Sequence, residues 1–97
     1  MQKIRVELLV AWPPTSSCNQ LIELAKRVAS EFGENVEINV YYRGQPYPVE
    51  PTVGFMYARK TLFIPAILVD GKVLAERELP TEEMLRKVIK GKLGIFT

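Results

Sequence analysis

Cys18 is the residue of this 97-residue chain best suited to covalent chemistry, and it stands alone. It is the one cysteine of the sequence, which also contains no histidine. These two facts exclude an internal disulfide, a CxxC zinc site, histidine metal ligands and both Ser–His and Cys–His catalytic pairs. No metal or cofactor is therefore predicted, and any covalent chemistry must use an isolated thiol.

The surroundings of Cys18 in the sequence support two interpretations. Thr15-Ser16-Ser17 can cap a helix N-terminus, where free N–H groups and the helix dipole lower the pKa of a thiol. Helical spacing also places Cys18 on an apolar stripe with Leu21 and Ala25, which is typical of a buried cysteine. The residues alone thus leave open whether Cys18 is a reactive thiolate or part of the core.

Hydrophobic periodicity predicts the elements that position Cys18. Lys3–Val10 alternates as a strand does, and Leu9 makes its end apolar on both faces, as in an interior strand. Two prolines in Ala11-Trp12-Pro13-Pro14 end this strand, and a helix follows from Thr15 to a C-cap at Gly33. The other predicted elements are a strand over Val36–Arg43, a short helix within Thr52–Lys60, a strand over Leu62–Val69 interrupted by Pro65, a strand over Lys72–Glu78 after the Asp70-Gly71 turn, and a helix from Thr81.

The resulting order, β-α-β-(α)-β-β-α, predicts one α/β domain over residues 1–97. Its first two strands are parallel and its last two form a hairpin, so the sheet is mixed and four-stranded, with helices on both faces. A ferredoxin-like order ranks second, because it needs a final strand where the Thr81 helix is predicted. The tyrosines are expected at the sheet margin: Tyr41, Tyr42, Tyr47 and Tyr57.

This order resembles the minimal thioredoxin or glutaredoxin fold, as in small archaeal thioredoxin-like proteins, over nearly the whole chain. Three features carry the resemblance: the Trp12 loop between strand and helix, Cys18 in the first helical turn, and Ile64-Pro65-Ala66 before the hairpin. The redox motif of that family is CxxC at the start of the first helix. Here the matching window is Thr15-Ser16-Ser17-Cys18, so Cys18 takes the second cysteine position and Thr15 the first.

The resemblance implies a cis Ile64–Pro65 bond and a substrate groove lined by Trp12 and Ile64-Pro65-Ala66. Trp12 is either a core anchor or a lip of that groove, and the residues favour the core anchor. Because Thr15 replaces the attacking cysteine, the chain cannot complete disulfide reduction by itself. The implied function is a single-cysteine redox protein that forms mixed disulfides with a protein or low-molecular-weight thiol. In that function Cys18 and Thr15 are the catalytic pair: the sulfur is partly accessible, and the Thr15 hydroxyl can donate a hydrogen bond to the thiolate. A sulfur on the inner face with Leu21 and Ala25 would instead be inert.

Two other functions remain open. The first is a binding module that keeps the groove but performs no chemistry. The second is a thiol peroxidase, because TxxC also resembles the peroxidatic motif PxxxTxxC of the peroxiredoxins. Ala11 stands where that motif requires proline, and Arg59 is the one arginine we name as a candidate partner of the thiolate.

Net charge and hydropathy argue against nucleic acids and membranes as binding partners. Thirteen basic and eleven acidic residues give a net charge of +2, which is too balanced to predict nucleic-acid binding. No apolar run approaches the roughly 20 residues of a membrane span, and strand-like sequence from Lys3 leaves no room for a leader. We therefore expect a cytoplasmic protein, monomeric or weakly dimeric, with no membrane association.

Overall fold

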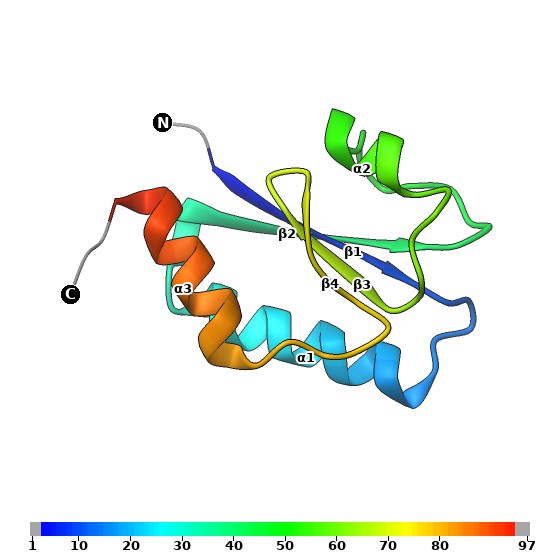
Figure 1. Cartoon of the computed structure of the whole chain (residues 1–97), viewed down its shortest axis with the longest axis horizontal. Helices are drawn as coiled ribbons and strands as arrows, with labels where there is room; N and C mark the ends of the chain where they lie inside the picture. The colour runs from blue at the N-terminus through cyan, green and yellow to red at the C-terminus, as the bar shows by residue number, and fades with distance from the viewer. Residues whose placement is uncertain (1–2, 95–97) are drawn as a thin grey trace.

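Four strands form one mixed sheet in the order β2-β1-β3-β4, with helices on both faces (Figure 1). The computed structural model describes residues 3–94. Their elements are β1 (Ile4–Val10), α1 (Ser16–Ser30), a 3₁₀ turn (Gly33–Asn35), β2 (Val36–Tyr42), α2 (Val53–Ala58), β3 (Ala66–Val69), β4 (Lys72–Glu76) and α3 (Glu82–Leu93). The order of elements predicted from the sequence is confirmed.

The strand β1 lies inside the sheet, as its apolar character predicts. It pairs in parallel with β2, with Leu8 opposite Val40, and antiparallel with β3, with Leu9 opposite Ala66. The hairpin β3–β4 completes the sheet through the turn at Asp70 and Gly71. The mixed, four-stranded sheet is therefore confirmed.

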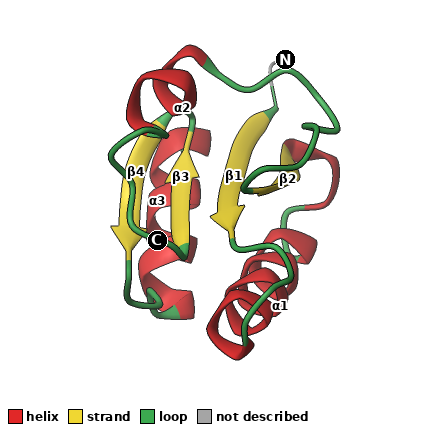
Figure 2. Cartoon of the chain, turned by 90° about the vertical axis from the view of Figure 1, so that its right-hand side faces the viewer, coloured by secondary structure: helices red, strands yellow, loops and turns green. Residues whose placement is uncertain are grey.

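Two hydrophobic clusters occupy the two faces of the sheet. The helices α1 and α3 cover one face, and α2 covers the other (Figures 1 and 2). Alternation along β1 assigns its side chains: Leu8 belongs to the cluster under α1 and α3, and Leu9 belongs to the cluster under α2. Each cluster buries apolar area from segments far apart in the sequence, which stabilises both layers. None of the helices in residues 3–94 is long and apolar enough to cross a bilayer.

Three local predictions are corrected. The α1 helix is capped at Glu31, and Gly33, with φ of +57°, begins the following 3₁₀ turn instead of capping the helix. The strand predicted over Leu62–Val69 begins only at Ala66, because Pro65 has no N–H to donate to a ladder. Tyr41 is fully buried rather than marginal, since α2 and the preceding loop place Phe55 and Tyr47 against its ring.

The helix α2 approaches the β3–β4 hairpin unusually closely at Gly54. A Cβ atom at Gly54 would lie 2.1 Å from the Gly71 carbonyl oxygen, which belongs to the hairpin backbone. Glycine at this position, a weak helix former by propensity, is thus required by backbone packing.

Candidate functional site

The connection that contains Trp12, between β1 and α1, and the loop that contains Pro65, before β3, meet at one edge of the sheet. Because β1 and β3 are antiparallel, the C-terminal end of β1 lies beside the start of β3, with Leu9 opposite Ala66. The connection from β1 to α1 therefore runs next to the loop that precedes β3 (Figure 2). The peptide bond Ile64–Pro65 is cis, as expected, and Trp12–Pro13 is cis as well.

The Cys18 side chain points inward from the first turn of α1. The residue is 0% exposed and belongs to the cluster under α1 and α3. Its Sγ accepts hydrogen bonds from the Thr15 hydroxyl at 3.2 Å and the Ala11 N–H at 3.4 Å. The Thr15 oxygen in turn accepts the Cys18 N–H at 3.2 Å and so caps the helix. Thr15 therefore both starts α1 and contacts the sulfur.

Burial and hydrogen bonding act in opposite directions on this thiol. Burial, the largest single influence, raises the pKa of Cys18, whereas hydrogen bonds from the Thr15 hydroxyl and from the Ala11 and Thr15 backbones lower it. The net result is a pKa below the ordinary value of a thiol. The predicted Thr15 hydrogen bond is confirmed. Of the two interpretations of Cys18, the buried sulfur is confirmed and the partly accessible one is wrong, because helical geometry directs Cys18 under the β1–α1 connection.

The four residues expected to line a groove differ in exposure. Trp12 is 56% exposed and meets Tyr42 edge-on, with 5.1 Å between ring centroids, so the favoured interpretation of Trp12 as a core anchor is wrong. Ile64 is partly buried, and Pro65 and Ala66 are buried. Only Trp12 and Ile64 of this set thus present side-chain surface at the edge.

Sequence reasoning missed a further apolar group in the loop before β3. Phe63 is half-exposed, and the Arg77 guanidinium lies 4.0 Å from the centroid of its ring. A cation over an aromatic face is attracted by the ring's electrostatic field. The signal in the sequence was the position of Phe63 directly before Ile64-Pro65, on a loop expected to face the thiol.

The structure does not bring Arg59 to Cys18. The Arg59 guanidinium donates to the Tyr47 hydroxyl at 3.3 Å and lines a pocket with Leu9 on the α2 side of the sheet. Cys18 lies in the cluster on the opposite side. A peroxidatic arrangement in which this arginine supports the thiolate is therefore not formed.

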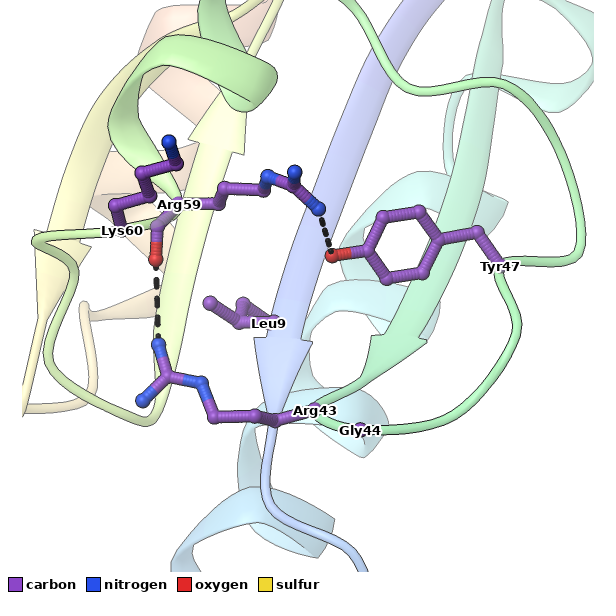
Figure 3. Close-up of a pocket in the computed structure, with 6 residues that line it drawn as sticks. All are labelled: Leu9, Arg43, Gly44, Tyr47, Arg59 and Lys60. Carbon is purple, nitrogen blue, oxygen red and sulfur yellow. Dashed lines mark hydrogen bonds between the residues drawn. The ribbon is translucent and has the colours of Figure 1, made fainter.

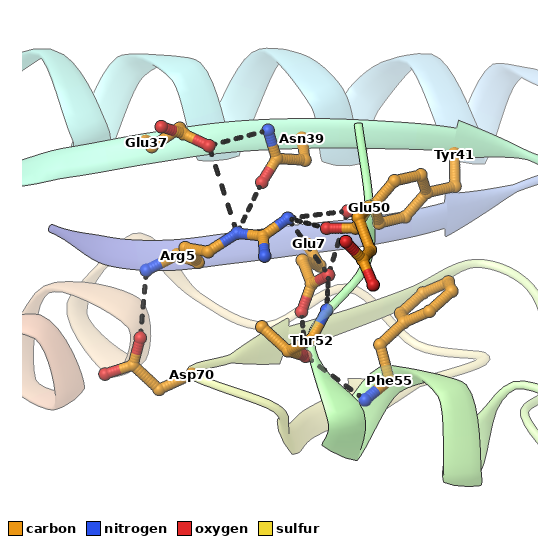
Figure 4. Close-up of polar contacts among 9 residues, drawn as sticks. All are labelled: Arg5, Glu7, Glu37, Asn39, Tyr41, Glu50, Thr52, Phe55 and Asp70. Atoms are coloured by element: carbon orange, nitrogen blue, oxygen red, sulfur yellow. Dashed lines mark hydrogen bonds and ion pairs between the residues drawn. The ribbon is translucent and has the colours of Figure 1, made fainter. Parts of the chain in front are cut away.

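A second polar cluster, which the sequence analysis did not identify, surrounds the carboxylate of Glu7. This side chain is fully buried between β1 and α2 (Figure 4). It accepts hydrogen bonds from the Tyr41 hydroxyl at 2.9 Å, from the Thr52 N–H at 3.0 Å and from the Thr52 hydroxyl. Arg5 covers the cluster and donates to Tyr41, Asn39 and the Glu50 carbonyl oxygen.

The polar cluster around Glu7 holds α2 against the sheet. Burial, and then the hydrogen bond to Glu7, raise the pKa of Tyr41, which therefore stays protonated as a donor. Thr52 caps α2, so its bonds to Glu7 tie the start of that helix to the centre of the sheet. The sequence signal was a charged residue inside a strand that is apolar on both faces, where a carboxylate must find buried donors.

The fold and these clusters define an α/β protein with a four-stranded mixed sheet, one buried thiol and one buried carboxylate. No family model matches the chain, and no curated protein matches its sequence. Among solved structures, a protein of unknown function from Staphylococcus aureus is similar to it, with a TM-score of 0.59 and 17% sequence identity. The similarity covers 97% of this chain and 94% of the other. At this level of identity the likeness concerns the fold alone.

Proposed function

We propose that this protein is a thioredoxin-like binding module in which Cys18 has a structural role. The observation that carries the proposal is the complete burial of Cys18, together with threonine in the position of the attacking cysteine. A thiolate reacts only where a substrate sulfur can reach it. The buried sulfur, bonded to Thr15 and Ala11, instead stabilises the turn between β1 and α1.

The thioredoxin-like assignment is supported by the element order and by the edge where the Cys18 helix starts. A β-α-β unit is followed by a hairpin and a last helix, and the loop with the cis Ile64–Pro65 bond adjoins the end of β1. In the family that the sequence resembles, the loop before the third strand pairs through its backbone with an extended segment of a substrate.

The same edge carries unpaired backbone groups and exposed aromatic side chains, which together can bind an extended peptide. Among the turn and loop hydrogen bonds between backbone groups in residues 3–94, none engages Ile64, so its N–H and carbonyl have no backbone partner there. Trp12 and Phe63 add exposed aromatic surface from the two adjoining segments. Main-chain hydrogen bonds with flanking apolar contacts are the ordinary means of binding an extended chain.

The first prediction concerns access to Cys18. We expect the native protein to react with iodoacetamide at neutral pH about a hundredfold or more slowly than the protein unfolded in guanidinium chloride, because the sulfur is reached only after local opening. Mass spectrometry of timed samples measures both rates. Equal rates would contradict the structural role and favour a reactive thiol.

A monothiol redox function is the second candidate, and the hydrogen bonds to Sγ favour it. They hold the pKa of Cys18 below its ordinary value, which favours the thiolate over the neutral thiol. In this function the Cys18 thiolate attacks a disulfide, a mixed disulfide forms, and the other sulfur leaves as a thiolate. A second thiol of low molecular weight then attacks the mixed disulfide and releases Cys18.

Thr15→Cys tests whether the groove persists around the altered motif. The substitution restores CxxC at the start of α1, and we expect insulin reduction with dithiothreitol to rise well above that of the wild type. The reason is that a second thiol lets the pair donate both electrons to the insulin disulfide, becoming an intramolecular disulfide that dithiothreitol then reduces. Thr15→Ser is the matched control and should stay inactive. No gain from Thr15→Cys in a folded protein would indicate that the edge no longer accepts a disulfide substrate.

A further inference from the structure

A pocket opens on the α2 face of the sheet, at the C-terminal ends of the parallel strands β1 and β2 (Figure 3). Its volume is about 360 Å³, within the range of small-ligand sites. Its lining residues are Leu9, Arg43, Gly44, Tyr47, Arg59 and Lys60. The sheet separates this pocket from Cys18, so what it binds does not depend on the function proposed above.

The lining contains three cations and no carboxylate. Among residues 3–94, the ion pairs involve Arg5, Arg27, Arg86 and Lys92, and none involves the three cations of the pocket. Glu50 lines a neighbouring hollow with Arg59 and Lys60 but does not line this pocket. Uncompensated positive charge in a concave site raises the local concentration of anions.

The Arg59 guanidinium has N–H donors that no protein acceptor in residues 3–94 uses. Its Nη1 reaches the Tyr47 hydroxyl at 3.3 Å, and its Nε is buried without a hydrogen-bond partner. Figure 3 shows this guanidinium extended above Leu9 toward Tyr47. A buried donor without an acceptor is destabilising, and an anionic oxygen that came within its reach would supply the acceptor.

Arg43 is held in place from the other side of the pocket. Its Nη2 donates to the backbone carbonyl oxygens of Arg59 and Leu62, at 3.3 Å and 3.2 Å. These bonds use one nitrogen of the guanidinium, which has five N–H donors in all. Arg43 is therefore oriented by the protein and still able to donate to a ligand.

We propose that this pocket binds the phosphate group of a small phosphorylated molecule. A dianionic phosphate matches several cations better than a singly charged carboxylate does, and planar guanidinium groups suit its oxygens. The partly buried Tyr47 ring supplies surface for the remainder of the ligand, and the buried Leu9 side chain forms the apolar floor beneath it. The position, outside the carboxyl ends of parallel strands, is where α/β sheets commonly bind ligands.

The test uses inorganic phosphate as the probe, titrated at constant ionic strength and followed by ¹⁵N chemical shifts. We expect saturable shifts at Gly44 and Arg59. Arg59→Gln should weaken binding about tenfold or more, because it removes a charged donor. Lys60→Gln, at an exposed position that folding tolerates, should weaken it to a smaller extent. The matched control is Lys87→Gln on α3, which loses the same charge away from the pocket and should bind as the wild type does.

Three results would overturn the proposal. Shifts that rise linearly without saturation would show that no site exists. Equal weakening by Lys87→Gln would show that only the net charge matters. Acetate binding as tightly as phosphate under the same conditions would exclude a site selective for phosphate. Chemical denaturation of each variant separates a loss of binding from a loss of folding.

Discussion

Glu7→Ala is expected to lower the free energy of unfolding by about 3–5 kcal/mol, because it breaks a buried charged cluster by removing one member. The Tyr41 hydroxyl, the Thr52 N–H and the Thr52 hydroxyl all lose their acceptor at once. Arg5 loses the carboxylate that lies 3.7 Å from its guanidinium. Since a domain of this kind has about 5–15 kcal/mol in total, the variant should be close to unfolding.

Glu37→Ala is the matched control for Glu7→Ala. Glu37 also lies within reach of Arg5, at 3.9 Å, but its side chain is 40% exposed. An exposed pair contributes about 0–1 kcal/mol, so this variant should remain near the wild type. Urea denaturation followed by circular dichroism measures the free energy of unfolding of both variants. Equal losses from the two variants would show that burial of the Glu7 carboxylate contributes nothing specific.

Gly54→Ala is expected to destabilise the protein by about 1–3 kcal/mol or more, although helix propensity alone predicts the opposite sign. The new Cβ would lie 2.1 Å from the Gly71 carbonyl oxygen and 2.7 Å from the Gly71 Cα. These are backbone atoms of the hairpin, so α2 must move away from the sheet to relieve the contact. Such a movement also strains the bonds between Thr52 and Glu7.

Gly91→Ala provides the comparison that isolates packing from propensity. Gly91 lies in α3, and a Cβ there would have no atom within 4 Å. This variant should gain stability, by up to about 1 kcal/mol, because alanine loses less backbone entropy than glycine on folding. Thermal unfolding of both variants measures the difference. A gain for Gly54→Ala equal to that for Gly91→Ala would contradict the close approach of α2 and the hairpin.

The sequence by itself determined the order and type of the elements. Their signals are local: alternating apolar residues in β1, the capping threonines Thr15 and Thr81, and the Asp70-Gly71 turn. Each depends on neighbours within a few residues, so it can be recognised without knowing the fold. The interior position of β1 also followed from its own residues, because a strand apolar on both faces needs cover on both.

Only the tertiary structure decided which side chains share a site. Helical spacing was compatible with an exposed or a buried Cys18. The sulfur is buried because the connection that follows β1 folds over it. Arg59, placed beside the thiolate in one hypothesis, lies instead across the sheet with Tyr47 and Leu9. The donors for Glu7 come from β2 and from Thr52, 45 residues further along the chain. Burial and pairing over such separations depend on how layers pack against one another, and no local pattern encodes that arrangement.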